Sequence, residues 1–213
     1  MIATLIGGTG LTGSSLVWQL LADPAITRLI SVSRRSLEIS NPKLTEVLVS
    51  DLAGLSSIES KIRGDLYFCC LGTTIKTAGS KENFEKVDHA AIVAFAKIAR
   101  ANDARSFTFV SAMGANANSM IFYNRVKGRT ENDVRARGLH FLIIFRPALL
   151  VGPRHEFRLA ERIMANTLVP LSLILPARIQ KSLVTKAETL AARMLDEGKA
   201  APGGVHVILA KDI

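Results

Sequence analysis

The chain has 213 residues, of which 48% are hydrophobic and 21% are charged, and its formal net charge is +9 at pH 7. This length and composition exclude an intrinsically disordered chain and allow one domain with a substantial core. The longest apolar stretches are interrupted by charges or by Pro170 and Pro176, so none is long enough to cross a bilayer and no membrane partner is expected. The apolar run at the N-terminus contains several glycines, and we expect a folded strand there instead of a leader peptide.

Strand-like and helix-like segments alternate along the chain, beginning with an expected strand at residues 2–7 and an expected helix at 11–22. Residues 66–71 form an uninterrupted apolar run, which is typical of a strand buried on both faces. About a dozen residues separate the second and third strands, too few for a crossover helix, so a loop or a single turn is expected there. The other expected strands lie at 28–33, 46–50, 106–111, 140–145 and 205–209, and the other expected helices at 81–103, 119–137 and 184–197.

This alternation predicts the fold class. Parallel strands joined by helices form a sheet that is covered on both faces. We therefore predict one α/β domain over residues 1–213, a three-layer, doubly wound fold with a mostly parallel sheet of about six to seven strands.

The two cysteines, Cys69 and Cys70, are adjacent and lie in the expected fourth strand. Neighbouring strand residues point to opposite faces of a sheet, so neither a shared metal ion nor an ordinary disulfide is expected. No cysteine–histidine spacing suggests zinc, and no metal site is predicted. We interpret both residues as small core side chains in a reducing compartment and predict a cytoplasmic location.

The positive net charge raises the question of nucleic-acid binding. The basic residues are scattered, however, and they are dense only at Arg34 and Arg35 and around Arg125, Lys127 and Arg129. Aromatic residues make up only 6% of the chain and do not alternate with a basic stripe. We therefore predict no nucleic-acid partner.

A glycine-dense turn joins the first strand to the first helix. It fits G-x-G-x-x-G from Gly8 through Gly10 to Gly13, and G-x-x-G-x-x-G when it is counted from Gly7. Gly10 lets the main chain approach a ligand closely, and Gly13 leaves room for the helix to pack on the strand. The free N–H groups and the positive dipole end of that helix would face an anion. The turn predicts a pyrophosphate site for a dinucleotide, the alternative being a tight turn without a ligand.

The residues that follow the second strand favour one dinucleotide over another. An acidic side chain there would bind the 2′-hydroxyl of NAD, but the chain has Ser33, Arg34 and Arg35, and nothing acidic before Glu38. Arginine binds phosphate through a fork of donors, so NADP is predicted and NAD is less favoured. The alternative is a solvated basic loop.

A tyrosine and a lysine four residues apart, Tyr123 and Lys127, share one face of an expected helix. An ammonium beside a phenol favours the phenolate, so the pair can exchange a proton with a carbonyl or alcohol oxygen while hydride moves to or from a nicotinamide. Ser111 lies where the fifth strand ends, at the sheet edge where ligands bind, and its hydroxyl could hold a substrate carbonyl. The alternative is an ordinary pair on a partly exposed helix and a serine that ends a strand.

These motifs together resemble the short-chain dehydrogenase/reductase superfamily, and most of all its atypical branch of Tat-interacting-protein and NmrA-like NAD(P)-binding proteins. The similarity runs from residue 1 to about 153 and more loosely to the end of the chain. It rests on the order and spacing of Gly7 to Gly13, residues 70–74 (Cys-Leu-Gly-Thr-Thr), Val87 with Asp88, residues 110–112 (Val-Ser-Ala), residues 123–127 and residues 145–147 (Phe-Arg-Pro). Many extended members have Asn where this chain has Asp88, and that departure weakens any claim to a complete catalytic tetrad.

The resemblance implies a Rossmann fold and assigns roles to individual residues. Tyr123 would be the acid or base, Lys127 the group that lowers its pKa and also holds the nicotinamide ribose, and Ser111 the residue that positions the substrate. Asp51 and Leu52 would touch adenine, although Asp51 can also be read as a helix N-cap. The implied cofactor contacts are Gly7, Thr9, Gly10, Leu11, Thr12, Gly13, Arg34, Arg35, Asp51, Leu52, Leu71, Gly72, Thr73, Lys127 and Pro147.

Two functions are expected from this reading. The first is an NADP-dependent oxidoreductase of a small-molecule carbonyl or alcohol, and the alternative is an NADP(H)-binding redox sensor or regulatory interaction protein with little turnover. The segment 152–183 is expected to cover the substrate, and its basic cluster from Arg154 to Arg162 is either a contact for an acidic substrate or a solvated helix face. The protein is expected to be a monomer or a homodimer.

Overall fold

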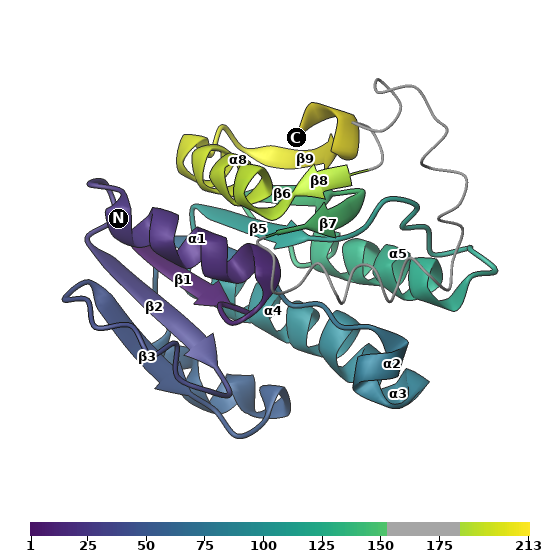
Figure 1. Cartoon of the computed structure of the whole chain (residues 1–213), viewed down its shortest axis with the longest axis horizontal. Helices are drawn as coiled ribbons and strands as arrows, with labels where there is room; N and C mark the ends of the chain where they lie inside the picture. Colours follow the sequence, from purple (N-terminus) through teal and green to yellow (C-terminus); the bar gives the residue numbers. More distant parts are fainter. Residues whose placement is uncertain (153–183) are drawn as a thin grey trace.

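Seven parallel strands form the central sheet of the computed structural model, which describes residues 1–152 and 184–213 (Figure 1). Every neighbouring pair is parallel, so the predicted doubly wound α/β fold is confirmed. In order across the sheet the strands are β3 (Leu44–Leu48), β2 (Arg28–Ser33), β1 (Ile2–Ile6), β4 (Leu66–Cys69), β5 (Ser106–Val110), β6 (Phe141–Arg146) and β9 (Gly204–Leu209). The chain direction across the sheet reverses between β1 and β4, and such a point leaves a crevice at the carboxyl ends of the strands.

Helices cover both faces of this sheet (Figure 1). They are α1 (Leu11–Ala22), the 3₁₀ helix η1 (Leu52–Lys61), α2 (Ile75–Ala78), α3 (Lys81–Glu85), the π-helical turn η2 (Lys86–Ala91), α4 (Ile92–Ala101), α5 (Phe122–Arg135), α8 (Ala187–Ala200) and the short 3₁₀ turn η4 (Ala210–Asp212). The buried residues of α1 and α8 pack on one face, and those of η1, α4 and α5 pack on the other. None of the helices in the described part of the chain is long and apolar enough to span a bilayer.

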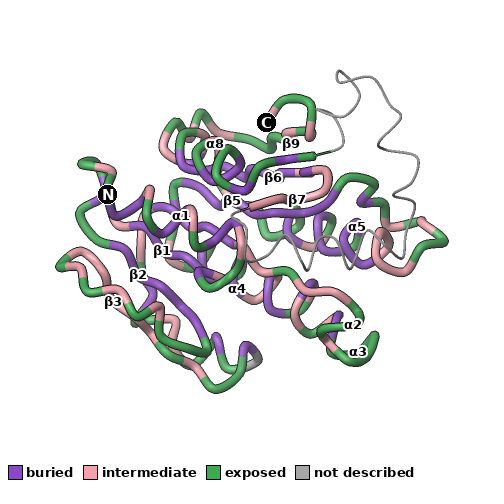
Figure 2. Tube along the Cα trace, in the orientation of Figure 1, coloured by how far each residue is buried: buried purple, intermediate pink, exposed green. Residues whose placement is uncertain are grey.

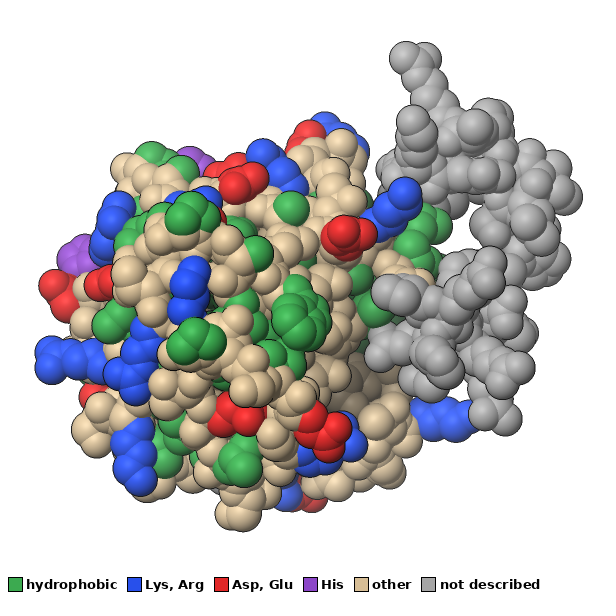
Figure 3. All heavy atoms as spheres, turned by 60° about the vertical axis from the view of Figure 1, so that its left-hand side comes forward, with side chains coloured by type: hydrophobic (Ala, Val, Ile, Leu, Met, Phe, Trp, Pro, Cys, Tyr) green, Lys and Arg blue, Asp and Glu red, His purple; other side chains and the backbone are tan. Residues whose placement is uncertain are grey.

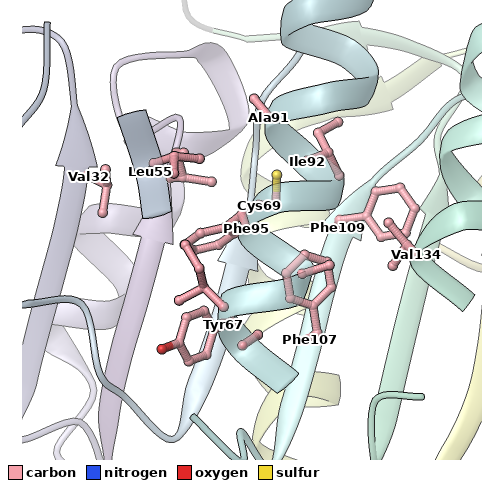
Figure 4. Close-up of a cluster of buried hydrophobic side chains, with 14 of the residues drawn as sticks. Val32, Leu55, Tyr67, Cys69, Ala91, Ile92, Phe95, Phe107, Phe109 and Val134 are labelled. Atoms are coloured by element: carbon pink, nitrogen blue, oxygen red, sulfur yellow. The ribbon is translucent and has the colours of Figure 1, made fainter. Parts of the chain in front are cut away.

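The alternation of side chains along each strand divides the core into two layers. In β4, Tyr67 and Cys69 belong to the layer under α4, whereas Leu66 and Phe68 belong to the layer under α1 and α8. Figure 4 shows the first of these layers, in which the rings of Tyr67 and Phe95 lie 5.2 Å apart. The central strands are accordingly buried along their length, and the exposed residues collect on the outer faces of the helices and in the loops (Figure 2).

The cysteine prediction agrees with this layering. Cys69 packs in one layer and Cys70 against the other, and both thiols are free. Burial raises the pKa of Cys69 to about 12, as expected of an inert core thiol. No group of three or more potential metal ligands occurs among the described residues.

The expected helix at residues 81–103 is continuous, but its middle is a π turn. α3 passes through η2 into α4 without leaving helical geometry. A π turn holds one more residue than an α turn, and such turns are frequent at functional sites. Here the π turn contains Asp88, whose side chain is completely buried.

Several predicted boundaries are wrong: the helix expected at 119–137 is Phe122–Arg135, and the strand expected at 66–71 ends at Cys69. Residues 184–186, expected to begin a helix, form the short strand β8 (Val184–Lys186), which pairs in parallel with β7 (Leu149–Val151). The alternating exposure of Val184, Thr185 and Lys186 is that of a strand, and the β-branched Val and Thr favour it. The third strand begins at Leu44, two residues before the expected start.

Other predictions hold or cannot be compared. The link between β2 and β3 is a loop without a helix, as predicted. Apart from Gly152, the segment expected to cover the substrate lies outside the described residues, and so does the basic cluster from Arg154 to Arg162. On the face shown in Figure 3, Lys and Arg side chains are interspersed with acidic and apolar ones.

Candidate functional site

The glycine turn between β1 and α1 holds three backbone segments in contact. A Cβ atom on Gly13 would lie 2.0 Å from the carbonyl oxygen of Gly7, and one on Gly7 would lie 2.6 Å from the carbonyl carbon of Cys70 at the end of β4. Gly7 also has a φ of +87°, which favours glycine. The turn therefore requires glycine at both positions, because any side chain would separate α1 or β4 from the end of β1.

The helix that follows the turn begins with unused hydrogen-bond donors. Its N-cap residue, Gly10, has no side chain to cap the helix, and the first turn contains no acidic residue. The N–H groups of Leu11, Thr12 and Gly13 have no hydrogen-bond partner among the described residues. The Thr12 hydroxyl is buried and also lacks a partner there. Exposed helix N–H groups and a positive dipole end are the usual elements of an anion site.

The loop after β2 lies against this turn. Leu37 approaches the position that a Gly8 Cβ would occupy to 3.4 Å. Arg34 and Arg35 are exposed, and the Ser33 hydroxyl donates to the carbonyl oxygen of Arg35 over 2.6 Å. The two predicted phosphate ligands thus lie at the same edge of the sheet as the glycine turn.

The loop after β3 carries the two residues that were predicted to contact adenine. Asp51 is exposed and attracts Lys86 electrostatically. Leu52 begins η1 and is buried in the core layer under α4. Asp51 is therefore open to solvent at the ligand edge, whereas the side chain of Leu52 packs inward.

A buried ion pair lies behind the loop after β4. The Lys127 Nζ atom is 2.8 Å from Oδ1 of Asp88, and their side chains are 3% and 0% exposed. The other carboxylate oxygen of Asp88 accepts the N–H of Thr73 over 2.8 Å. Burial alone would lower the pKa of Lys127, but the Asp88 carboxylate and then Tyr123 outweigh it and raise the pKa above its ordinary value. Lys127 is consequently a cation whose charge is already balanced.

Tyr123 lies one turn before Lys127 on α5, as its spacing predicted. Its ring is 5.7 Å from that of Phe84, and it is partly exposed. No described residue forms a hydrogen bond with its hydroxyl. The phenol is thus free to meet a ligand atom.

Ser111 takes part in a second buried network. Its hydroxyl donates to Oε1 of Glu131 over 2.6 Å. Arg146 donates to the same carboxylate from Nε over 2.9 Å and from Nη2 over 2.6 Å, and this hydrogen bonding raises the pKa of Arg146. Arg146 thus pairs with a buried carboxylate at the end of β6.

Among the described residues, the hydroxyl of Ser111 donates to Glu131 and the ammonium of Lys127 pairs with Asp88, whereas the hydroxyl of Tyr123 has no partner. Pro147, another predicted cofactor contact, is buried, and its carbonyl oxygen accepts the N–H of Met113 over 3.0 Å. Leu71 and Thr73 are partly exposed and Gly72 is exposed in the loop after β4.

Sequence reasoning missed two residues of this region. Glu131 continues the four-residue spacing of Tyr123 and Lys127, and that repeat was the available signal. Gly128 was missed as well: a Cβ atom there would lie 2.1 Å from the backbone nitrogen of Ala117, so the loop before α5 crosses the helix at this point. The sequence signal for Gly128 is its position directly after Lys127.

Comparison with protein families gives a match over most of the chain. A family model described as NAD(P)H-binding matches residues 7–167. Among curated proteins, "Protein fmp52, mitochondrial" of Emericella nidulans is 36% identical over 165 residues, which cover 75% of this chain and 71% of that protein. "Protein FMP52, mitochondrial" of Candida albicans is 36% identical over 160 residues, covering 73% of this chain and 70% of that protein.

Solved structures with low sequence identity share the fold. MoeE5, in complex with UDP-glucose and NAD, superimposes with a TM-score of 0.72 at 14% identity and covers 97% of this chain and 75% of that chain. UDP-glucose 4-epimerase of Thermotoga maritima, with UDP-glucose, gives a TM-score of 0.69 at 18% identity and covers 98% and 76%. At such identities the likeness concerns the architecture alone.

The names of the relatives correct one prediction. Both are called mitochondrial proteins, as is the similar protein of Aspergillus fumigatus. The predicted cytoplasmic location is therefore wrong. It rested on the reduced state expected of two core cysteines, which does not distinguish one reducing compartment from another.

The Glu131 network generates a stability prediction. Glu131→Gln replaces a carboxylate that accepts from Arg146 and Ser111 by a neutral amide, and should lower the free energy of unfolding by about 2 kcal/mol. Ser111→Ala removes one donor and leaves the Arg146 contacts, so about 1 kcal/mol is expected. Urea unfolding followed by circular dichroism measures both. A Glu131→Gln protein as stable as the wild type would contradict the network.

Proposed function

The chain belongs to the NAD(P)H-binding family, and from this we propose that it is an NADP-dependent oxidoreductase of the short-chain dehydrogenase/reductase type, acting on a carbonyl or alcohol group of a small molecule. The observation that carries the proposal is the glycine turn. It presents the N–H groups of Leu11, Thr12 and Gly13, which have no partner in the described part of the chain, at the carboxyl edge of a doubly wound sheet.

The residues present fit a dinucleotide. Gly7, Gly8, Gly10 and Gly13 leave the backbone of the turn without side chains at these positions. The buried Thr12 hydroxyl is without a partner among the described residues, which is costly unless a ligand supplies one. The bound nicotinamide ring would supply or accept hydride. The residues that would hold the cofactor are Gly7, Thr9, Gly10, Leu11, Thr12 and Gly13 in the turn, Arg34, Arg35, Asp51 and Leu52 at the adenosine end, and Leu71, Gly72, Thr73, Lys127 and Pro147 at the nicotinamide end.

The loop after β2 supports NADP as the cofactor. Arg34 and Arg35 offer two guanidinium groups to a 2′-phosphate. Glu46, in the neighbouring strand β3, accepts the hydroxyl of Ser36 over 2.8 Å and the N–H of Leu37 over 2.7 Å. The two arginines directly follow β2 and would give a phosphate two cationic partners, whereas the exposed carboxylate of Glu38 lies three residues further along the loop.

The free phenol of Tyr123 supports its role as the acid or base. It can donate a proton to a carbonyl oxygen during reduction and take one from an alcohol during oxidation. Lys127 lies one turn further along α5, where its ammonium interacts electrostatically with Tyr123. Ser111 contributes an oxygen with free lone pairs, because its proton is already donated to Glu131.

Two contacts favour the second candidate, an NADP(H)-binding sensor or interaction protein with little turnover. The Ser111 proton is directed at Glu131 instead of at a substrate carbonyl, and the charge of Lys127 is balanced by Asp88. Both arrangements weaken the groups that would stabilise a transition state, and neither affects the turn that holds the cofactor.

Binding is tested at the turn. Gly13→Ala places a Cβ atom 2.0 Å from the Gly7 carbonyl oxygen, so α1 must move away from β1 and the anion site opens. NADPH should raise the melting temperature of the wild type and leave that of the variant unchanged. Gly54→Ala is the matched control, because nothing lies closer than 3.9 Å to a Cβ there. Wild-type heats of NADPH binding in Gly13→Ala would remove the turn from the site.

Cofactor choice is tested at the two arginines. Replacing Arg34 and Arg35 together by serine should weaken NADPH binding roughly 10- to 100-fold, because charge-assisted hydrogen bonds to a phosphate are lost, and should leave NADH binding within about threefold. Isothermal titration calorimetry measures both affinities. Arg28→Ser, at the exposed start of β2, serves as the control for net charge. An equal loss for NADPH and NADH would argue against recognition of the 2′-phosphate.

Catalysis is tested at the phenol. Tyr123→Phe removes the hydroxyl and keeps the ring contact with Phe84, so NADPH affinity should be preserved while kcat for NADPH oxidation with a panel of aldehydes and ketones falls at least about 100-fold. Unchanged turnover would eliminate Tyr123 as the acid. A wild-type protein that binds NADPH but oxidises it with no member of the panel would favour the sensor.

A further inference from the structure

The Asp88–Lys127 ion pair lies directly behind the loop that is proposed to pass beneath the nicotinamide half of the cofactor. The position of a Cβ atom on Gly72 is 3.8 Å from Oδ1 of Asp88 and 3.9 Å from Nζ of Lys127. The two opposite charges are thus equally close to one exposed point of the backbone. Because Gly72 has no side chain, nothing from that residue separates the pair from whatever lies on the loop.

Asp88 is held so that it cannot turn away from Lys127. Its Oδ2 atom accepts the N–H of Thr73, and its backbone carbonyl oxygen accepts the hydroxyl of Thr130 over 2.8 Å. It also lies within the π turn, between α3 and α4. The contacts of Asp88 with the loop after β4, with α5 and within its own helix therefore hold its carboxylate beside the ammonium of Lys127.

A buried charge at this place would distinguish the two redox states of the cofactor. The oxidised nicotinamide ring carries a positive charge and the reduced ring is neutral, while the phosphates of the two forms are the same. An unpaired ammonium would disfavour the oxidised form, and an unpaired carboxylate would favour it. A pair placed equally close to the loop cancels both effects.

We propose that Asp88 is a specificity-determining residue for the redox state of the cofactor: by neutralising Lys127 beside Gly72, it lets the site bind the oxidised form with no penalty from the lysine charge. The inference rests on the proposed function, because it requires a nicotinamide nucleotide on this loop. It assigns Asp88 an electrostatic role that differs from that of the neutral Asn found in many extended relatives.

A purely structural role for the pair makes a different prediction. If Asp88 and Lys127 only hold α5 against the π turn, disturbing them loosens the site and weakens both cofactor forms by the same factor. The ratio of the two dissociation constants then stays constant. That ratio is therefore the readout that separates electrostatics from packing.

The experiment removes each charge singly and then both together, and it measures the Kd values of NADP⁺ and NADPH by calorimetry at pH 6.5. The quantity compared is the ratio of the Kd for NADP⁺ to the Kd for NADPH. Asp88→Asn keeps an oxygen for the Thr73 N–H and leaves the ammonium unpaired, so the Kd ratio should shift roughly tenfold in favour of NADPH. Lys127→Met leaves the carboxylate unpaired and should shift the ratio roughly tenfold the other way. The double variant has neither charge and should return the ratio to within about threefold of the wild type.

Asp133→Asn is the matched control. It removes a carboxylate that pairs with His89 over 2.6 Å between the same two helices, but that is 47% exposed and lies six residues further along α5. For Asp133→Asn, the ratio of the Kd values for NADP⁺ and NADPH should equal that of the wild type.

The outcomes separate the two proposals. Circular dichroism identifies any variant that does not fold. If the Asp88→Asn variant does not fold, the difference in the Kd ratio between Lys127→Met and the double variant still measures the effect of the carboxylate. A constant ratio in the folded variants overturns the inference and leaves the proposed function intact. Absence of binding of either form to the wild-type protein defeats the proposed function itself.

Discussion

The close contact of three backbone segments at the glycine turn is the constraint on which the rest of this structure depends. Gly7 and Gly13 let the end of β1, the start of α1 and the end of β4 meet without an intervening side chain. This contact brings the N-terminus of α1 to the carboxyl edge of the sheet, where its first N–H groups have no described partner. The proposed anion site would be a consequence of packing, because the same missing side chains that let the helix dock also leave the backbone N–H groups accessible.

Behind that edge, three buried charged side chains and the partly buried Arg146 form two ion pairs. Asp88 pairs with Lys127, and Glu131 pairs with Arg146 and also accepts the Ser111 hydroxyl. Removing ions from water is costly unless each finds a partner, so the balance is what allows four charged side chains to lie beneath the ligand edge. It also restrains the chemistry, because a lysine with a carboxylate partner and a serine with an acceptor act more weakly on a substrate than free ones would.

The parts of the fold that follow from local pattern could be predicted from the sequence. The apolar strands, the glycine turn and the short link after β2 each have a signal within a few neighbouring residues. The π turn does not, since the apolar spacing from Val87 to Ile98 fits a regular helix and conceals the additional residue. Nor does η1, whose residues carry no clear periodicity. The four-residue repeat places Glu131 on the same face of α5 as Lys127, but it does not reveal the partners of Ser111 and Lys127. Glu131 and Asp88 reach them only through the packing of α5 on the sheet and on η2.

The position of α5 on the sheet therefore determines where the polar groups of the candidate site lie. Tyr123, Lys127 and Glu131 lie along one stripe of this helix, and its position is set where it touches its neighbours. At Gly128 the loop before the helix crosses at backbone distance, and at Thr130 a hydroxyl reaches the carbonyl oxygen of Asp88. Neither residue carries a charge or faces a ligand in the proposed scheme. Yet a shift of α5 at either contact would move the phenol, the ammonium and the carboxylate together, so the helix behaves as one unit whose three polar groups cannot be positioned independently.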